Sequence, residues 1–69
     1  MNPNQLKAEL GSQKLMVKRT DETVDGVTMY VQYTGSKIQL KNRIPDGGEL
    51  IEIVETYASP SLAVIHFKR

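Results

Sequence analysis

The chain has 69 residues, no cysteine, 39% apolar residues and a formal net charge of +1. Such a length suits one domain, residues 1–69, near the lower limit of what folds without crosslinks. The missing cysteines exclude a disulfide framework and a thiolate metal site, and the balanced charge provides no overall steering toward nucleic acid. Because no apolar run approaches the roughly 18 residues of a membrane span and no basic or apolar leader is present, we expect a cytoplasmic protein in a reducing compartment, with no membrane partner.

The N-terminal residues predict a short helix. Asn2 is a good cap, Pro3 suits the first helical position, and Leu6 and Leu10 lie one turn apart before Gly11. Because two turns of helix are unstable alone, the two leucines must pack against the rest of the domain.

A first strand is predicted over residues 14–20, where apolar and polar side chains alternate. A polar stretch follows over 21–26, with Asp25 and Gly26 as its turn signal. The pairing of this strand with the next stays open. A strict two-residue turn and a three-residue bulged loop would turn opposite faces of the strand toward the core.

The clearest pattern is a hairpin over residues 27–44. Residues 27–34 alternate and are rich in β-formers, and residues 37–44 alternate again. Between them, Gly35 and Ser36 match a two-residue type II′ loop. This loop pairs Thr34 with Lys37, so the register of the whole hairpin follows from it.

Two further segments complete the chain. Residues 49–58 fit a helix by apolar spacing and a strand by residue type, and we favour the strand. Residues 62–68 are nearly all apolar, which indicates a strand that is central or covered on both faces.

The predicted fold is therefore mainly β, of the α+β class: a short N-terminal helix followed by a five-strand antiparallel small barrel or strongly bent sheet. In outline this resembles Sm-like and other small β-barrels, a likeness of topology that transfers no residue or activity. The alternative is an α-β-β-β-α-β order, an open sheet with helices on one face.

The hairpin register predicts a basic face centred on Tyr30. Cations for phosphates and an aromatic ring for a base are the parts with which sheets bind single-stranded nucleic acid. Lysines on exposed strands also guard edges against aggregation, so a merely solvated face is the alternative. The predicted binding residues for nucleic acid or another anionic partner are Lys14, Lys18, Tyr30, Gln32, Lys37, Gln39, Lys41 and Arg43.

No catalytic residue, metal site or cofactor is predicted. His66, the single histidine, lies within an apolar strand and fits a half-buried residue with a hydrogen bond. One histidine without cysteine excludes a conventional structural zinc site, and the acids at 21, 22 and 25 lack the ligand spacing of a calcium loop.

Two function classes follow from these observations. The first is a non-enzymatic binding module for single-stranded nucleic acid or another anionic partner. The alternative is a protein-binding adaptor, an assembly subunit or a small inhibitor of the kind phages encode, with exposed strand edges that can recruit a partner strand. The small core also favours association with a partner chain or a second copy.

Overall fold

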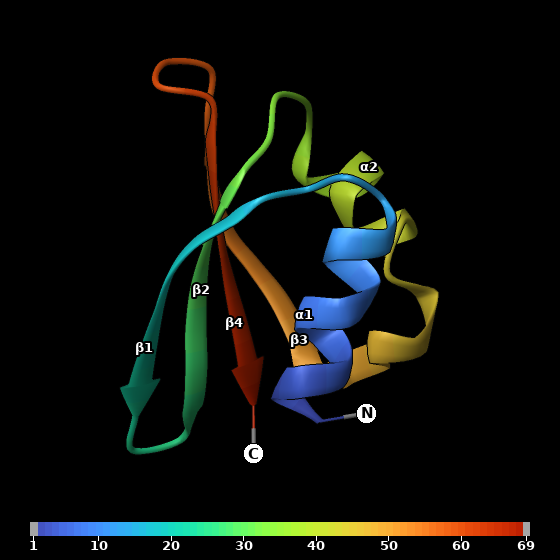
Figure 1. Cartoon of the computed structure of the whole chain (residues 1–69), viewed down its shortest axis with the longest axis vertical. Coiled ribbons are helices and arrows are strands. Elements are labelled where there is room, and N and C mark those ends of the chain that lie inside the picture. The colour runs from blue at the N-terminus through green and yellow to red at the C-terminus, as the bar shows by residue number, and fades with distance from the viewer. Residues whose placement is uncertain (1, 69) are drawn as a thin grey trace.

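The computed structural model describes residues 2–68, which form two helices, a 3₁₀ segment and four strands. The elements in chain order are α1 (Pro3–Ser12), β1 (Val17–Thr23), β2 (Gly26–Gln32), α2 (Lys37–Asn42), η1 (Pro45–Leu50), β3 (Ile51–Tyr57) and β4 (Leu62–Lys68). The strands make one antiparallel sheet in the order β1-β2-β4-β3. Both helices lie against the same face of this sheet, and the opposite face is open (Figure 1). The result is a two-layer α+β arrangement in which a helix followed by a strand pair occurs twice.

The predicted N-terminal helix is confirmed, and its start has the expected chemistry. The Asn2 side chain accepts a hydrogen bond from the Gln5 amide at 2.9 Å, and the Gln5 side chain accepts one from the Asn2 amide at 2.7 Å. This reciprocal capping satisfies two amides that lack helical partners. Leu6 and Leu10 are fully buried, so they attach α1 to the sheet.

The final strand is central in the sheet, as its composition predicts, because β4 pairs with β2 on one side and β3 on the other. It is covered on one face only. Ala63, Ile65 and Phe67 are buried beneath the helices, whereas Val64 and His66 lie on the open face and are half-buried. The strand interpretation of residues 49–58 is also confirmed, since β3 occupies Ile51–Tyr57.

The β1–β2 hairpin pairs Thr23 with Gly26, so Val24 and Asp25 form its turn. The predicted first strand, 14–20, begins three residues too early and ends three too early. The backbone of Lys14 has a φ of 62°, which ends α1 instead of starting a strand. Gly26 is required where it stands, because a Cβ there would lie 1.9 Å from the backbone oxygen of Phe67.

The predicted hairpin over 27–44 is wrong, because residues 37–42 form α2 and not a strand. Ser36 caps this helix, since its hydroxyl accepts a hydrogen bond from the Gln39 amide at 3.1 Å. Leu40 and Ile44 lie one helical turn apart and are both buried. Positions four apart share a face in a helix as well as in a strand, so their alternation fitted both structures.

This change removes the fifth strand and with it the predicted barrel. The sheet has four strands and does not close. The alternative order α-β-β-β-α-β is wrong as well, because two strands precede α2 and two follow it. Its open sheet with helices on one face is nevertheless the arrangement observed (Figure 1).

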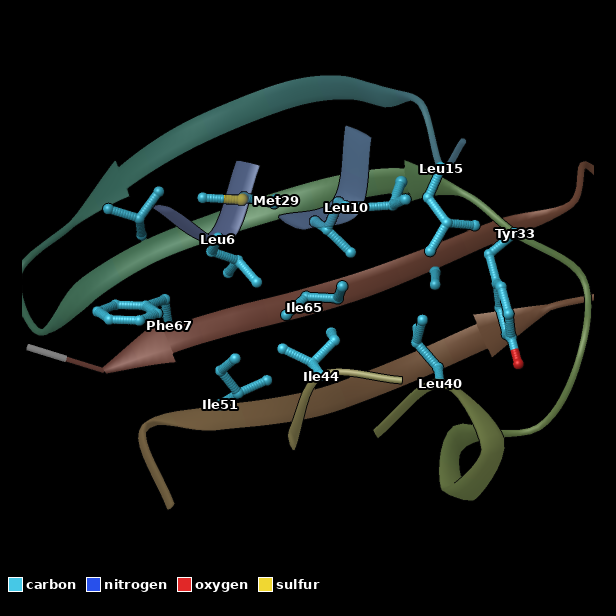
Figure 2. Close-up of a cluster of buried hydrophobic side chains, with 13 residues drawn as sticks. Leu6, Leu10, Leu15, Met29, Tyr33, Leu40, Ile44, Ile51, Ile65 and Phe67 are labelled. Carbon is cyan, nitrogen blue, oxygen red and sulfur yellow. The ribbon is translucent and has the colours of Figure 1, made fainter. Parts of the chain in front are cut away.

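One layer of apolar side chains fills the space between the helices and the sheet (Figure 2). Leucines of α1 approach from one side, and Leu40 and Ile44 approach from the other. Between them lies Ile65 of the central strand β4. The buried cluster comprises Leu6, Leu10, Leu15, Val27, Met29, Val31, Tyr33, Leu40, Ile44, Ile51, Ala63, Ile65 and Phe67.

The helix at 37–42 can be tested with two neighbouring substitutions. Leu40→Ala is expected to lower the free energy of unfolding by about 2–5 kcal/mol, the usual cost of emptying a core leucine site. Ile38→Ala is expected to change it by less than about 0.5 kcal/mol, because Ile38 is 74% exposed. Urea denaturation measures both values. Equal losses would contradict the helix, since a strand turns both side chains to the same face.

Candidate functional site

The eight predicted binding residues do not share a sheet face. Tyr30 and Gln32 lie on the open face, opposite Val64 and Leu62 of β4. Lys18 is exposed on β1, next to a break in the strand register. The other cations and Gln39 are on the helical layer or the loops: Lys37, Gln39 and Lys41 belong to α2, Arg43 follows it, and Lys14 follows α1. The predicted basic face is therefore wrong, because it required 37–44 to be a strand.

Tyr30 has a different cation beside it. Arg19 of β1 lies opposite Tyr30, with its guanidinium carbon 5.5 Å from the ring centre. The Arg19 Nε donates to Asp21 at 2.9 Å, and this carboxylate raises the pKa of the guanidinium above its usual value. Glu52 lies on the same face, opposite His66. Asp21 thus pairs with the cation at Tyr30, which does not suit a polyanion.

Lys41 has an internal role. Its Nζ donates to the backbone oxygens of Gly48 and Ile51, so the lysine joins α2 to the start of β3. Lys37 makes a longer contact, with 3.9 Å between its Nζ and a carboxylate oxygen of Glu55. The Lys41 ammonium therefore stabilises the fold by holding α2 to the start of β3.

Both edges of the sheet are interrupted. The register of β1 shifts between Val17 and Arg19, and that of β3 shifts between Ile53 and Glu55. On β3, the Thr56 amide donates to Glu55 Oε1 at 3.2 Å, and the backbone oxygen of Ile51 accepts from Lys41. Such features block strand addition, so the edges are poor sites for a partner strand.

Three predicted residues do converge at one cavity, here called the end groove. Its volume is about 410 Å³, within the range of small-ligand sites. It lies where the segment after α1, the end of β2 and the end of α2 come together. Its lining comprises Lys14, Leu15, Met16, Gln32, Tyr33, Thr34, Arg43 and Ser61.

Arg43, which follows α2, is held in place by Gln13, the residue that caps the end of α1. The Arg43 Nε donates to Gln13 Oε1 at 2.8 Å, and its Nη2 donates to the Gln13 backbone oxygen at 3.2 Å. In return, Gln13 Nε2 donates to the Arg43 backbone oxygen and, at 2.9 Å, to Glu9 Oε1. These bonds use two of the five guanidinium N–H groups, so an oriented arginine retains donors for a ligand.

The end groove also contains unusual backbone geometry. Within residues 2–68, the only positive φ values outside glycine are 62° at Lys14 and 64° at Ser61. Both residues line the groove. Such geometry costs of order 1–3 kcal/mol per residue and is concentrated at functional sites. At Lys14 this geometry ends α1, and at Ser61 it lies in the turn before β4, so both values belong to turns that border the groove.

The charge of the groove favours an anion. Its described lining contains two cations, Lys14 and Arg43, and no carboxylate. Gln32 supplies an amide, and Thr34 and Ser61 supply hydroxyl groups. Lys14, Gln32 and Arg43 of this lining are among the predicted binding residues, whereas Met16, Thr34 and Ser61 are not, because nothing in the sequence indicates that the segment after α1, the end of β2 and the turn before β4 lie together.

His66 forms a second polar cluster, on the open face. Its Nδ1 lies 3.1 Å from the Thr28 hydroxyl, which is the kind of hydrogen bond expected from the sequence. Its Nε2 lies 3.4 Å from Asp25 Oδ1. The pKa of Asp25 is lowered, mainly by a hydrogen bond from the Thr23 hydroxyl at 3.0 Å and to a smaller degree by His66. This cluster ties the β1–β2 turn to β4.

The described residues contain neither a metal-binding cluster nor a membrane-spanning helix. No three His, Asp or Glu side chains within residues 2–68 are grouped to hold a metal ion. Neither helix in this range is long and apolar enough to cross a membrane.

Comparison with known proteins adds no relative. The chain matches no protein-family model, no curated protein and no solved structure at a significant level.

Lys41→Met tests the internal role of that lysine. The substitution is expected to lower the free energy of unfolding by roughly 1–3 kcal/mol, because two backbone oxygens lose a charged donor. As a matched control, Lys37→Met is expected to cost less than about 0.5 kcal/mol, since its ion pair is long and exposed. Urea denaturation compares the two variants, and equal small effects would contradict the role.

Thr23→Val tests the cause of the low Asp25 pKa. The isosteric change removes the hydroxyl donor, so the Asp25 pKa is expected to rise toward its ordinary value in an NMR titration of the carboxyl carbon. A carboxylate with a lowered folded pKa stabilises the protein above its unfolded pKa and loses that effect as the pH falls through the folded one. The stability gap to wild type is therefore expected near neutral pH and should close as the pH falls through the lowered pKa of Asp25. An unchanged Asp25 titration would assign the shift elsewhere.

Proposed function

We propose that this chain is a non-enzymatic binding module that holds single-stranded nucleic acid in the end groove. The observation that carries the proposal is the meeting of Lys14 and Arg43 at a cavity of about 410 Å³ without an opposing carboxylate among the described residues. A concave site of this size suits one splayed nucleotide better than the broad surface of a duplex.

The groups around the groove have distinct parts in this proposal. The oriented guanidinium of Arg43 matches two phosphate oxygens, and the Lys14 ammonium supplies a mobile point charge. Gln32 and Thr34 offer hydrogen bonds to sugar or base edges. Met16, which is 60% exposed, provides an apolar surface for a base.

The aromatic residue of the groove has no free ring to offer. Tyr33 is buried, and its hydroxyl donates to the Ser36 backbone oxygen at 3.1 Å. Tyr30 lies on the open sheet face, beside Arg19. Because stacking on exposed rings contributes much of the affinity in single-strand sites, binding led by phosphates should be weak and tolerant of base sequence.

Fluorescence anisotropy with a short labelled oligothymidylate tests the proposal. Two phosphate contacts predict a slope of log affinity against log salt of roughly −1.4, and Lys14→Ala should reduce its magnitude by roughly 0.7. Lys14→Glu is expected to weaken binding about tenfold or more.

Lys68→Glu is the matched control, because it changes the net charge equally. Lys68 lies six residues from Leu62 along β4, about 20 Å from the groove end of the strand. It should bind nearly as wild type does. Equal losses in the two variants would indicate a net-charge effect, and the absence of any salt-sensitive binding would refute the proposal.

A second candidate is a protein-binding module, whether adaptor, assembly subunit or inhibitor. The specific observation in its favour is the exposure of large apolar side chains at two separate places, Val24 in the β1–β2 turn and Ile38 on α2. A stoichiometric protein partner that survives nuclease and high salt would favour it over the first.

A further inference from the structure

A second cavity, here called the α2–β3 groove, lies between α2 and the edge strand β3. Its volume is about 270 Å³, and Ile38, Ile51 and Ile53 provide its apolar wall. Lys37, Lys41 and Asn42 complete the lining. Ile38 is 74% exposed on a six-residue helix, an unusual place for so large an apolar side chain. Two lysines against the nearby Glu55 leave the surroundings of this apolar groove positive.

The tip of the β1–β2 hairpin has the opposite character. Val24 is fully exposed in the turn, so it projects as an apolar knob. An acid, Asp25, follows it directly. The Asp25 side chain is 77% exposed and keeps its carboxylate at the tip. The turn lies at the lower end of the molecule, and α2 lies toward the upper end (Figure 1), so the knob and the groove of one chain are far apart.

We propose that the hairpin tip of one copy docks in the α2–β3 groove of a second copy. Val24 packs against Ile38, Ile51 and Ile53. Asp25 then approaches Lys37 at the rim. A second copy is the occupant because this chain itself carries the complement of the groove, an apolar knob beside an exposed negative charge.

The geometry of this contact determines the type of assembly. Different surfaces of the two copies meet, so each copy retains a free groove or a free tip, and association continues into a ring or an open chain. A single hairpin tip covers less than the roughly 1,200 Å² of a stable interface. The contact should therefore be weak, screened by salt, and visible at concentrations of about 0.1–1 mM.

Sedimentation velocity on the full chain, supported by NMR, tests this proposal. Wild type is expected to associate beyond dimers as its concentration rises. Val24→Ser removes the knob and Ile38→Asp spoils the groove. Each variant should therefore show at least about tenfold weaker self-association. Both positions are exposed, so both variants should keep the wild-type fold in NMR spectra.

Mixing the two variants gives the decisive result. Val24→Ser retains an intact groove and Ile38→Asp retains an intact tip, so an equimolar mixture should form heterodimers and stop there. Tyr57→Ser, which alters an exposed apolar side chain outside the α2–β3 groove and the hairpin tip, should associate as wild type does. A monomeric wild type at about 1 mM, a mixture that does not associate, or either variant associating normally would overturn the proposal.

This proposal does not depend on the end groove. Lys14→Glu should leave self-association unchanged, and Val24→Ser should leave oligonucleotide binding unchanged. Failure of one proposal is therefore distinguishable from failure of the other.

Discussion

The structure depends on one apolar layer, because each of its elements buries a single face. Leu6 and Leu10 of α1, together with Leu40 and Ile44, cover the central strands β2 and β4. Two-turn helices are unstable without such contacts, and a four-stranded sheet is unstable with both faces wet. The helices and the sheet therefore form together or not at all. Everything attached to this layer, including both grooves, takes its position from it.

The cations divide between the fold and the surface according to the partners that the layer places near them. Lys41 lies above the bend before β3 and donates to two backbone oxygens. Arg43, two residues on, donates to Gln13 at the end of α1. These hydrogen bonds orient the guanidinium and leave some of its N–H donors unused. Lys14 projects from a strained position beside it. A chain with a net charge of only +1 can therefore present a local positive site without a strongly basic surface.

The repeated helix and hairpin arrangement separates the end groove from the tip of the β1–β2 hairpin. The end groove lies where α1, β2 and α2 end, whereas the β1–β2 turn projects from the opposite end of the sheet (Figure 1). Bulges and side-chain caps occupy the strand edges, so association through grooves and turns is the route that remains.

The sequence by itself determined the elements whose signals are local, the capped helix at Asn2 and the central strand at 62–68. For residues 49–58 it only favoured a strand over a helix. It could not determine residues 37–44, because Leu40 and Ile44 share a face in a helix and in a strand alike. The tertiary structure decided for the helix, since β1 and β4 occupy both sides of β2 and leave no edge for another strand. The candidate site likewise depends on the tertiary structure. Lys14, Gln32 and Arg43 are recognisable as polar residues in the sequence, but their convergence needs a contact across 30 residues between Gln13 and Arg43, and only packing of both helices on one sheet provides it.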